Sequence, residues 1–397
     1  MPRPIDPLLE GLLSAVEREL PGAVALRHRL HAEPELAHAE QRTAAAIEAE
    51  LPVPAQTVAH TGRIAAISSS GGARPIAVRA ELDGLPISER TGAPFSASGE
   101  TMHACGHDIH MAALVALARA AHTLSETLPA PLLAVFQPSE EAYPSGAQEL
   151  PRGELKQLAP AAVVAAHIHP ELPWGTVALD AGTVNASCDA FEIVIEGEPS
   201  HGAYPHRGRD PILALAQVVV ALHAQLGRRI DPLSAATLTV GSIEGGSADN
   251  VIPSSARARG ALRAHLPEDR ALLRELAKEV VAGVASAAGC RATLELNPGE
   301  PALENDPAIV ERARAMLMSA GLQPAKPWRS CGSDDFAFFG ELGPVAMAFV
   351  GLDGAPGFQR RPLHHPELLP PDQAVGALAR VLGVLYLAAA RSLAPSG

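Results

Sequence analysis

The strongest constraint on the fold is an alternation of short apolar runs with helical stretches. Residues 75–81, 132–136 and 162–166 are short, apolar and partly β-branched, and residues 111–128, between the first two runs, show helical spacing. Short buried strands separated by helices are typical of a largely parallel sheet with helices packed on it. We therefore predict an α/β layer for the chain up to about residue 185.

From about residue 189 the pattern changes to that of a second domain. Apolar and polar residues alternate over residues 191–196, as in a half-exposed strand. The expected elements that follow are a helix at 210–226, strands at 236–243 and 256–265, a helix at 267–287 and a strand at 291–296. This β-α-β-β-α-β order is that of a ferredoxin-like α+β unit. Because the α/β pattern then resumes, we predict a discontinuous main domain, residues 1–187 and 298–397, with residues 188–297 inserted as a smaller domain.

The N-terminal part of the chain predicts a helix and no targeting segment. Residues 7–20 have helical apolar spacing, and Pro21-Gly22 is expected to end that helix. Residues 1–6 contain no basic segment followed by an apolar one, so we expect no secretory signal. The longest apolar stretches are interrupted well short of the ~20 residues that a membrane span needs, so no membrane partner is expected.

Charge and composition exclude one class of partner. The 397 residues include 31 Lys+Arg against 44 Asp+Glu, a formal net charge of −13, and only 3% are aromatic. Nucleic-acid-binding proteins need a basic surface and stacking side chains, so we expect no nucleic-acid partner. Four widely separated cysteines are too few for a disulfide scaffold. We expect a reducing cytoplasm, in which Cys105 is available as a thiolate.

The densest polar cluster is the string His-Ala-Cys-Gly-His-Asp-Ile-His at residues 103–110. In an extended segment, residues two apart share a face, so Cys105 and His107 can point into one site. Thiolate and neutral imidazole suit Zn²⁺ or another late first-row ion. The alternative is that the histidines make ordinary hydrogen bonds and Cys105 is buried and inert. The density of the cluster favours a metal site.

Three other segments offer further donors. Residues 136–141, Phe-Gln-Pro-Ser-Glu-Glu, follow an apolar strand and place two carboxylates where ligands bind in open α/β sheets. One carboxylate could coordinate a metal while its neighbour holds a proton, although such a pair alone is more often a solvated acidic turn. Residues 166–170 and 363–366 carry histidines that would supply the remaining ligands for two metals. Each of these histidines could also be an ordinary core residue.

With these segments, the chain resembles the M20 metallopeptidase and aminoacylase family. The resemblance is to its amidohydrolase branch, which includes hippurate hydrolases, N-acyl-amino-acid deacetylases and indole-acetyl-amino-acid hydrolases. It covers nearly the whole chain, through residues 29–36, 79–86, 102–110, 137–141, 167–170, 200–206, 250–253, 332–336 and 363–366. The family often has Asp where this chain has Glu81, and residues 142–146 are not the commonest Gly-rich form. Both departures lie close to the predicted site, so they affect the expected substrate preference more than the expected reaction.

The resemblance implies two divalent metal ions per subunit (Zn, Mn, Co or Ni). The ligands it implies are Cys105, His107, Glu141, His167 and His364. Glu140 would be the general base, and Asp83 would support the ligands. The inserted domain would dimerise and act as a lid, and its His201 would reach the neighbouring subunit's active site. Asn250 and Arg263 match positions associated with the substrate's carboxylate end. An ordinary ion pair for Arg263 and a surface position for His201 remain open.

The implied reaction is hydrolysis of an N-acyl-L-amino acid, carrying an N-acetyl, N-benzoyl or similar group, by a metal-activated water. Glu140 would take the proton of that water and return it to the departing amine, and His201 would donate to the oxyanion. Two alternatives are a dipeptidase or N-carbamoyl amino acid hydrolase on the same scaffold, and a non-catalytic metal-binding or ligand-binding protein. In a purely structural site Glu140 would have no evident role. The Gly/Ser-rich residues 241–247 lack the ending of a phosphate-binding loop and are expected to form an ordinary loop.

Overall fold

The chain forms two compact units in the computed structural model, which describes residues 6–69 and 72–393. The larger unit contains the chain up to Gly182, the segment Glu304–Trp328 and the chain from Phe338 onward, and the smaller contains Thr183–Leu303 and Arg329–Ala337. The segment Arg329–Ala337 therefore groups with the smaller unit, whereas the sequence placed it in the main domain. Residues 1–5, which carry most of the expectation about a secretory signal, lie outside the described residues.

The larger unit is built on an eight-stranded mixed sheet in the order β1-β2-β4-β3-β5-β16-β6-β15. Its strands are β1 (Ala55–Val58), β2 (Gly62–Ile67), β3 (Ile76–Glu81), β4 (Leu132–Gln137), β5 (Ala162–Pro173), β6 (Thr176–Ala178), β15 (Gln323–Pro324) and β16 (Val345–Asp353). The central strands β4, β3, β5 and β16 are parallel, and β1, β2 and β6 run antiparallel to a neighbour. The three predicted strands are confirmed, and β5 continues beyond its predicted end.

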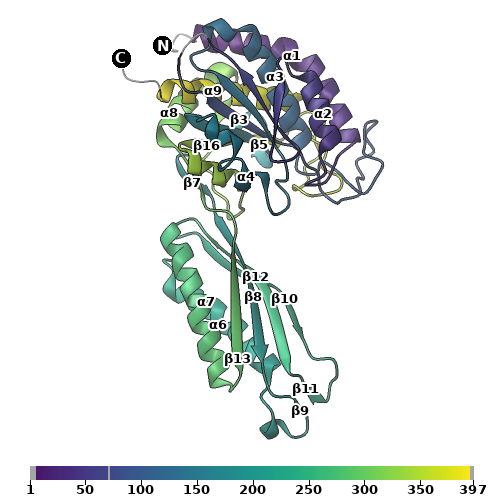
Figure 1. Cartoon of the computed structure of the whole chain (residues 1–397), viewed down its shortest axis with the longest axis vertical. Coiled ribbons are helices and arrows are strands. Elements are labelled where there is room, and N and C mark those ends of the chain that lie inside the picture. Colours follow the sequence, from purple (N-terminus) through teal and green to yellow (C-terminus); the bar gives the residue numbers. More distant parts are fainter. Residues whose placement is uncertain (1–5, 70–71, 394–397) are drawn as a thin grey trace. The chain divides into compact units, whose positions relative to one another are not determined.

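Helices cover this sheet and bury its central strands. They are α1 (Pro7–Ala32), α2 (Gln41–Glu50), α3 (His107–Thr123), α8 (Pro307–Leu317) and α9 (Gln373–Ser392), with the short α4 (Gly146–Glu149) and α5 (Glu154–Gln157). Helices α3 and α9 contact the strands, and α1 packs on both helices (Figure 1). All residues of β3 and β4 are buried. The polar side chains of these two strands, Arg79, Glu81 and Gln137, all lie toward the carboxyl ends.

Helix α1 does not stop at Pro21-Gly22, and that prediction is wrong. Pro21 lies inside the helix, and both Pro21 and Gly22 are exposed. Proline removes one hydrogen bond, to the carbonyl of residue 17, and Glu17 is also exposed and open to water. Burial of Leu26 and Leu30 on the next turns outweighs that loss.

The smaller unit has a four-stranded antiparallel sheet in the order β10-β12-β8-β13. Its elements are β8 (Ser187–Glu196), α6 (Pro211–Arg229), β10 (Ala236–Gly245), β12 (Ser255–Ala264), α7 (Pro267–Ala287) and β13 (Arg291–Pro298), with a two-stranded ribbon of β9 (Ser200–His201) and β11 (Val251–Ile252). Helices α6 and α7 lie on one face of the sheet (Figure 1). This is the β-α-β-β-α-β order that the sequence indicated. The chain crosses between the units near β7 (Gly182–Asn185) and β14 (Leu303–Asn305).

Two expectations from local composition need correction. Residues 241–245 are not a loop but continue β10, with a register shift between Val240 and Ser242 that lets the strand follow β12 to its end. Within residues 6–69 and 72–393, two helices are also long and apolar enough to cross a membrane by length and composition alone, which the sequence estimate did not anticipate; a buried core helix passes the same test. Of the 18 most apolar consecutive residues of α9, 89% are buried inside the larger unit, as in a core helix. For α6 the corresponding share is 28%.

Gly260 on β12 tests the packing of the smaller unit. A Cβ atom there would lie 2.0 Å from the carbonyl oxygen of Thr239 and 2.4 Å from the ring of Phe191, so backbone would have to move. We expect Gly260→Ala to lower the free energy of unfolding by about 1–3 kcal/mol, measured by calorimetry or urea titration.

Gly283→Ala is the matched control for Gly260→Ala. Gly283 lies inside α7, is exposed, and has no atom within 4 Å of an added Cβ among the residues described. Because alanine favours a helix over glycine, this variant should be more stable by about 0.5–1 kcal/mol. Equal effects at the two positions would contradict the packing argument.

Candidate metal centre

The candidate centre lies in the larger unit, at the edge where its parallel strands end. Asp83 follows β3, Glu140 and Glu141 follow β4, and His167 lies in β5. Because β3, β4 and β5 run in parallel, their carboxyl ends meet at one edge. The start of α3 and the loop containing His364 bring the remaining donors to this edge.

The turn into α3 places Cys105 and His107 on either side of Gly106. Gly106 has φ +86°, a left-handed conformation that glycine adopts without cost, and an added Cβ would lie 2.2 Å from Cδ1 of Ile168. The helix therefore begins at His107, four residues before its predicted start, and it ends at Thr123 rather than near 128. The close approach of Gly106 to Ile168 brings Cys105 to the strand that carries His167.

Hydrogen bonds hold His107, at the start of α3, and His167, in β5, in defined tautomers. The Nδ1 atom of His107 lies 2.8 Å from the carbonyl oxygen of Asp83, and that of His167 lies 2.6 Å from the carbonyl oxygen of Ile168. A carbonyl only accepts, so each Nδ1 carries a proton, and in the neutral form of each ring the lone pair lies on Nε2. The Nε2 atom of His167 lies 3.4 Å from Sγ of Cys105, and that of His107 lies 3.8 Å from Oε2 of Glu140.

Glu141 and His364 complete the group. The Nε2 atom of His364 lies 3.2 Å from Oε1 of Glu141, and donor atoms of both residues lie within 4.8 Å of Sγ of Cys105. Donor atoms of His107, Glu140 and Glu141 form a second such group. The main-chain N–H of His364 donates to the carbonyl of Ala104 at 2.8 Å, which ties this distant segment to the Cys105 turn. The five residues predicted as ligands are thus brought together.

The donor atoms fit a metal ion. The Nε2 atom of His107 and Oε1 of Glu141 are buried and have no hydrogen-bond partner among the residues described. Buried polar atoms are rarely left unsatisfied, because they lose their hydration without compensation. Sulfur, imidazole nitrogen and carboxylate oxygen are together the donors that zinc and related divalent ions take.

The charge of the site also favours a cation. Burial would lower the pKa of His107, but the carboxylates of Glu81, Asp83 and Glu141 raise it to about 10. Their negative charge is therefore large enough to outweigh the cost of holding a buried imidazolium. A divalent ion would satisfy the same carboxylates directly.

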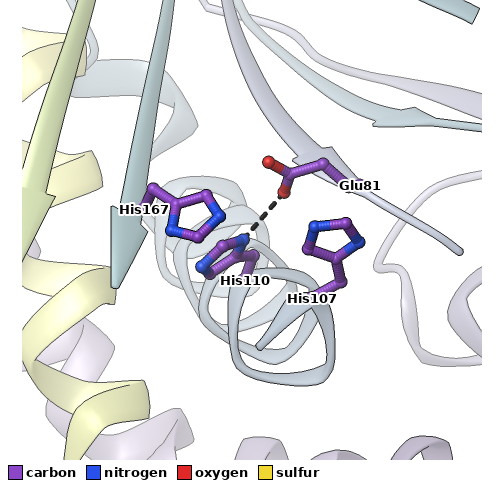
Figure 2. Close-up of side chains that lie close together, drawn as sticks. All are labelled: Glu81, His107, His110 and His167. Carbon is purple, nitrogen blue, oxygen red and sulfur yellow. Dashed lines mark hydrogen bonds and ion pairs between the residues drawn. The ribbon is translucent and has the colours of Figure 1, made fainter. Parts of the chain in front are cut away.

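Glu81 and His110 lie beside the ligand candidates but are engaged elsewhere (Figure 2). The Nε2 atom of His110 accepts the N–H of Ile168 at 3.2 Å, and its Nδ1 donates to Oε2 of Glu81 at 2.8 Å. The other oxygen of Glu81 pairs with Arg79. Burial would raise the pKa of Glu81, but Arg79 and the histidines hold it well below its usual value. His110 therefore supports the strand of His167. The sequence could have indicated this neighbour, because His110 lies one helical turn after His107 and therefore on the same face of α3.

Asp83 links the two groups of donors. It is fully buried, and its Oδ2 accepts the N–H of Glu141 at 2.9 Å. Burial would raise its pKa, but His107 and the amides of residues 140 and 141 lower it, so it stays ionised. Asp83 thus contacts both His107 and the main chain of the loop that carries Glu140 and Glu141.

The other predicted site residues lie in the smaller unit. His201 is exposed on β9, and its Nδ1 accepts the N–H of Ala203 at 3.0 Å, which leaves the proton on Nε2. Asn250 is exposed beside it, and its carbonyl accepts the N–H of Gly202. Arg263 on β12 is half-buried and donates through Nη1 to the carbonyl of Cys331 at 3.0 Å. The ribbon of β9 and β11 therefore groups His201 with Asn250.

Known proteins resemble this chain over most of its length. A model of "Peptidase family M20/M25/M40" matches residues 77–385. N-acetyl-L-cysteine deacetylase of Bacillus subtilis (strain 168) is 36% identical over 368 residues, which are 91% of this chain and 86% of that protein. N-acetyldiaminopimelate deacetylase of Bacillus pumilus (strain SAFR-032) is 32% identical over 371 residues, 91% and 96% of the two chains. A solved Bacillus subtilis structure, described as a dinuclear metal binding peptidase from M20 family, superposes with a TM-score of 0.82 at 28% identity, covering 94% and 98%.

A buried charge network, which sequence reasoning missed, holds the start of α3. Asp108, next to His107, accepts from Nε of Arg27 at 3.0 Å and from Nδ1 of His31 at 3.0 Å. The Nε2 atom of His31 lies 3.1 Å from Oε1 of Glu89. Both ring nitrogens of His31 thus face carboxylates. Burial would lower the pKa of His31, but Asp108 and Glu89 raise it to about 9.

This network predicts a loss of stability in alkali. The pKa of His31 is raised on folding from 6.5 to about 9, so its contribution is complete below pH 6.5 and disappears as the pH rises through 9. We expect the free energy of unfolding of the metal-free protein to fall between these pH values. The part due to His31 should be on the order of 1–3 kcal/mol.

The measurement is a series of urea titrations from pH 6 to 10 on the wild type and on His31→Gln, both with chelator. Because other groups also titrate, the difference between the two proteins is the quantity to follow. It should shrink as the pH rises. A difference that stays constant with pH would mean that His31 is not charged in the folded protein.

Proposed function

Because the chain belongs to Peptidase family M20/M25/M40, we propose that it is a metal-dependent amidohydrolase that cleaves N-acyl-L-amino acids. The products would be a carboxylate and a free amino acid. The names of the two deacetylase relatives support this substrate class, since both refer to N-acetylated amino acids. The observation that carries the proposal is a second carboxylate, Glu140, next to the metal-ligand candidate Glu141 and 3.8 Å from Nε2 of His107.

We assign the metal ligands to the donors that converge at the sheet edge. They are Cys105, His107, Glu141, His167 and His364. Together they would hold two divalent ions, for which Zn²⁺, Mn²⁺, Co²⁺ and Ni²⁺ are the candidates. When bound, two such ions lower the pKa of a water and polarise the amide carbonyl. Because Nδ1 of His107 and of His167 already donates to a carbonyl, both rings would bind a metal through Nε2 without a change of tautomer, and His107 would release its Nε2 proton on binding.

Glu140 would supply the proton transfers. Its carboxylate accepts the proton of the attacking water as the oxygen adds to the amide carbon, and it then delivers that proton to the amine nitrogen as the C–N bond breaks. Such general acid–base transfer contributes typically ~10²–10⁴-fold to the rate. Asp83 would hold the main chain of Glu141 through the N–H that it accepts, so the neighbouring carboxylates keep distinct positions.

The smaller unit would recognise the substrate. The Nε2–H of His201 is an exposed donor suited to the oxyanion, because its Nδ1 is already occupied as an acceptor. Asn250, on the same ribbon, and Arg263 would bind the free carboxylate of the substrate. Arg263 offers a guanidinium that can form paired hydrogen bonds with a carboxylate.

We also propose a cytoplasmic homodimer formed through the smaller unit. The outer face of α6 carries exposed apolar side chains, including Leu213 (57% exposed) and Val220 (70% exposed). Strand β10 is an edge strand with an exposed Ile243, and an edge of this kind can pair with a second chain. His201 would then act on the neighbouring subunit. A reducing compartment would keep Cys105, which is in no disulfide with a described residue, available as a ligand.

Removal of metal and replacement of Glu140 test the activity. We expect a chelator to abolish amine release from N-acetyl and N-benzoyl amino acids, and one of the four candidate ions to restore it. Glu140→Gln should keep its metal content but lose at least about 10²-fold in kcat, because the amide cannot take a proton. Glu149→Gln, an exposed carboxylate on α4, should remain fully active.

Dipeptides and N-carbamoyl amino acids belong in the same assay, because faster turnover of either would replace N-acyl amino acids as the substrate class. Turnover of none of these compounds by the metal-loaded protein would refute the proposed function. An active Glu140→Gln would refute only the assignment of the base.

Introducing negative charge on the exposed face of α6 tests whether this face forms the dimer and whether His201 acts across subunits. The double variant Leu213→Glu and Val220→Glu should be monomeric by light scattering, should retain its metal, and should lose activity. Met318→Glu, at an exposed position of the larger unit, should remain an active dimer. A fully active monomer would exclude action of His201 across subunits.

A further inference from the structure

The loop that carries Glu140 begins with a strained residue. Ser139, directly before Glu140, has φ +53° and is 3% exposed. Residues with a side chain rarely adopt this left-handed conformation, because Cβ crowds the backbone. Such a conformation persists only where the surroundings hold it in place. The position of Glu140 therefore depends on what holds Ser139.

A buried carboxylate holds Ser139. The side chain of Glu40 has no exposed surface, and its Oε1 accepts the main-chain N–H of Ser139 at 2.7 Å and the Ser139 hydroxyl at 3.2 Å. Its Oε2 accepts the hydroxyl of Thr61 at 2.8 Å. Thr61 directly precedes β2, which pairs with β4. The hydroxyl of Ser139 also contacts His38, through Nδ1 at 3.0 Å and the main-chain N–H at 2.9 Å.

Glu40 is not needed as a helix cap. It occupies the N-cap position of α2, yet its side chain makes no capping hydrogen bond. Glu35 performs that function instead, accepting the N–H of Thr43 at 2.7 Å and its hydroxyl at 2.9 Å. Among the described residues, the buried carboxylate of Glu40 accepts hydrogen bonds only from Ser139 in the loop and from Thr61 just before β2, and none from the helix.

A second carboxylate holds the other side of the loop. Asp83 accepts the N–H of Glu141 at 2.9 Å, one residue after Glu140. The main chain is thus fixed on both sides of Glu140, at Ser139 by Glu40 and at Glu141 by Asp83. We propose that Glu40 is a positioning residue that sets the direction of the Glu140 carboxylate by holding Ser139 in its left-handed conformation. This inference rests on the proposed role of Glu140 as the base.

The kinetic test compares Glu40→Ala, Glu40→Gln and Glu35→Ala in the metal-loaded full chain. Glu40→Ala leaves the buried N–H of Ser139 without an acceptor, so the loop should relax. Since a misplacement of about 1 Å can cost 10²-fold in rate, we expect kcat to fall by roughly 10- to 100-fold, with KM within about threefold. Glu40→Gln keeps an oxygen for the N–H of Ser139 and should restore kcat to within a few-fold of wild type.

Glu35→Ala is the matched control, because Glu35 is another carboxylate of this segment with little exposure (10%), and its carboxylate caps α2 and pairs with Arg42. It should lower the melting temperature while kcat stays near wild type. A loss of kcat equal to that of Glu40→Ala would overturn the proposal, because both variants would then act through stability alone. Should Glu40→Ala not fold, Thr61→Val removes one hydrogen bond to Glu40 at nearly constant shape. It should lower kcat by a few-fold, and an unchanged kcat would overturn the proposal.

The structural test does not depend on activity. Crystal structures of the zinc-loaded wild type and Glu40→Ala, or Thr61→Val in its place, should show Ser139 leaving the positive φ region and the Glu140 carboxylate displaced, with Glu141 still held by Asp83. Unmoved Ser139 and Glu140 would overturn the inference. A wild type that hydrolyses none of the substrates would refute the proposed function, whereas the comparison of the two structures would still decide the role of Glu40.

Discussion

Two hydrogen bonds that point away from the candidate centre decide what it can bind. His107 and His167 each donate Nδ1–H to a main-chain carbonyl, one following β3 and one within β5. Because those carbonyls belong to parallel strands of a buried sheet, the rings cannot easily rotate or exchange tautomers. In its neutral form each ring therefore presents a lone pair to the region of Cys105 and Glu140. With the opposite tautomer, both would present protons, and no cation could be held there.

The parts of the fold that the sequence predicted well are those in which local pattern and tertiary packing agree. Strands β3 and β4 are buried throughout and mostly apolar, with polar residues only at Arg79, Glu81 and Gln137 near their ends, so their positions follow largely from composition. The pattern misled where tertiary contacts overrode it. Pro21 lies on the exposed side of α1 and does not end it, and the Gly/Ser-rich end of β10 is kept extended by pairing with β12. Neither outcome is encoded within a few residues of the position concerned.

The same distinction separates the donors from their supports. Cys105, His107 and Glu141 stand in short strings of chemically distinctive residues, which is why they could be identified without a structure. Glu40 and Ser139 are 99 residues apart, and Arg27 and Asp108 are 81 apart. Each of these side chains is ordinary in its local context, and only folding shows that it is buried against a partner. Positioning groups of this kind are invisible to motif analysis because their chemistry is a property of the pair.

The main-chain bond from His364 to Ala104 has a consequence for the order of events during synthesis. A nascent chain leaving the ribosome already contains Cys105, His107, Glu141 and His167, but His364 emerges only after the whole of Thr183–Leu303 has been made. With the ligands assigned above, full metal loading consequently requires synthesis to have passed residue 364. A chain terminated before residue 364 would have an incomplete site, in which the thiol of Cys105 and the imidazoles of His107 and His167 could bind other thiophilic metal ions.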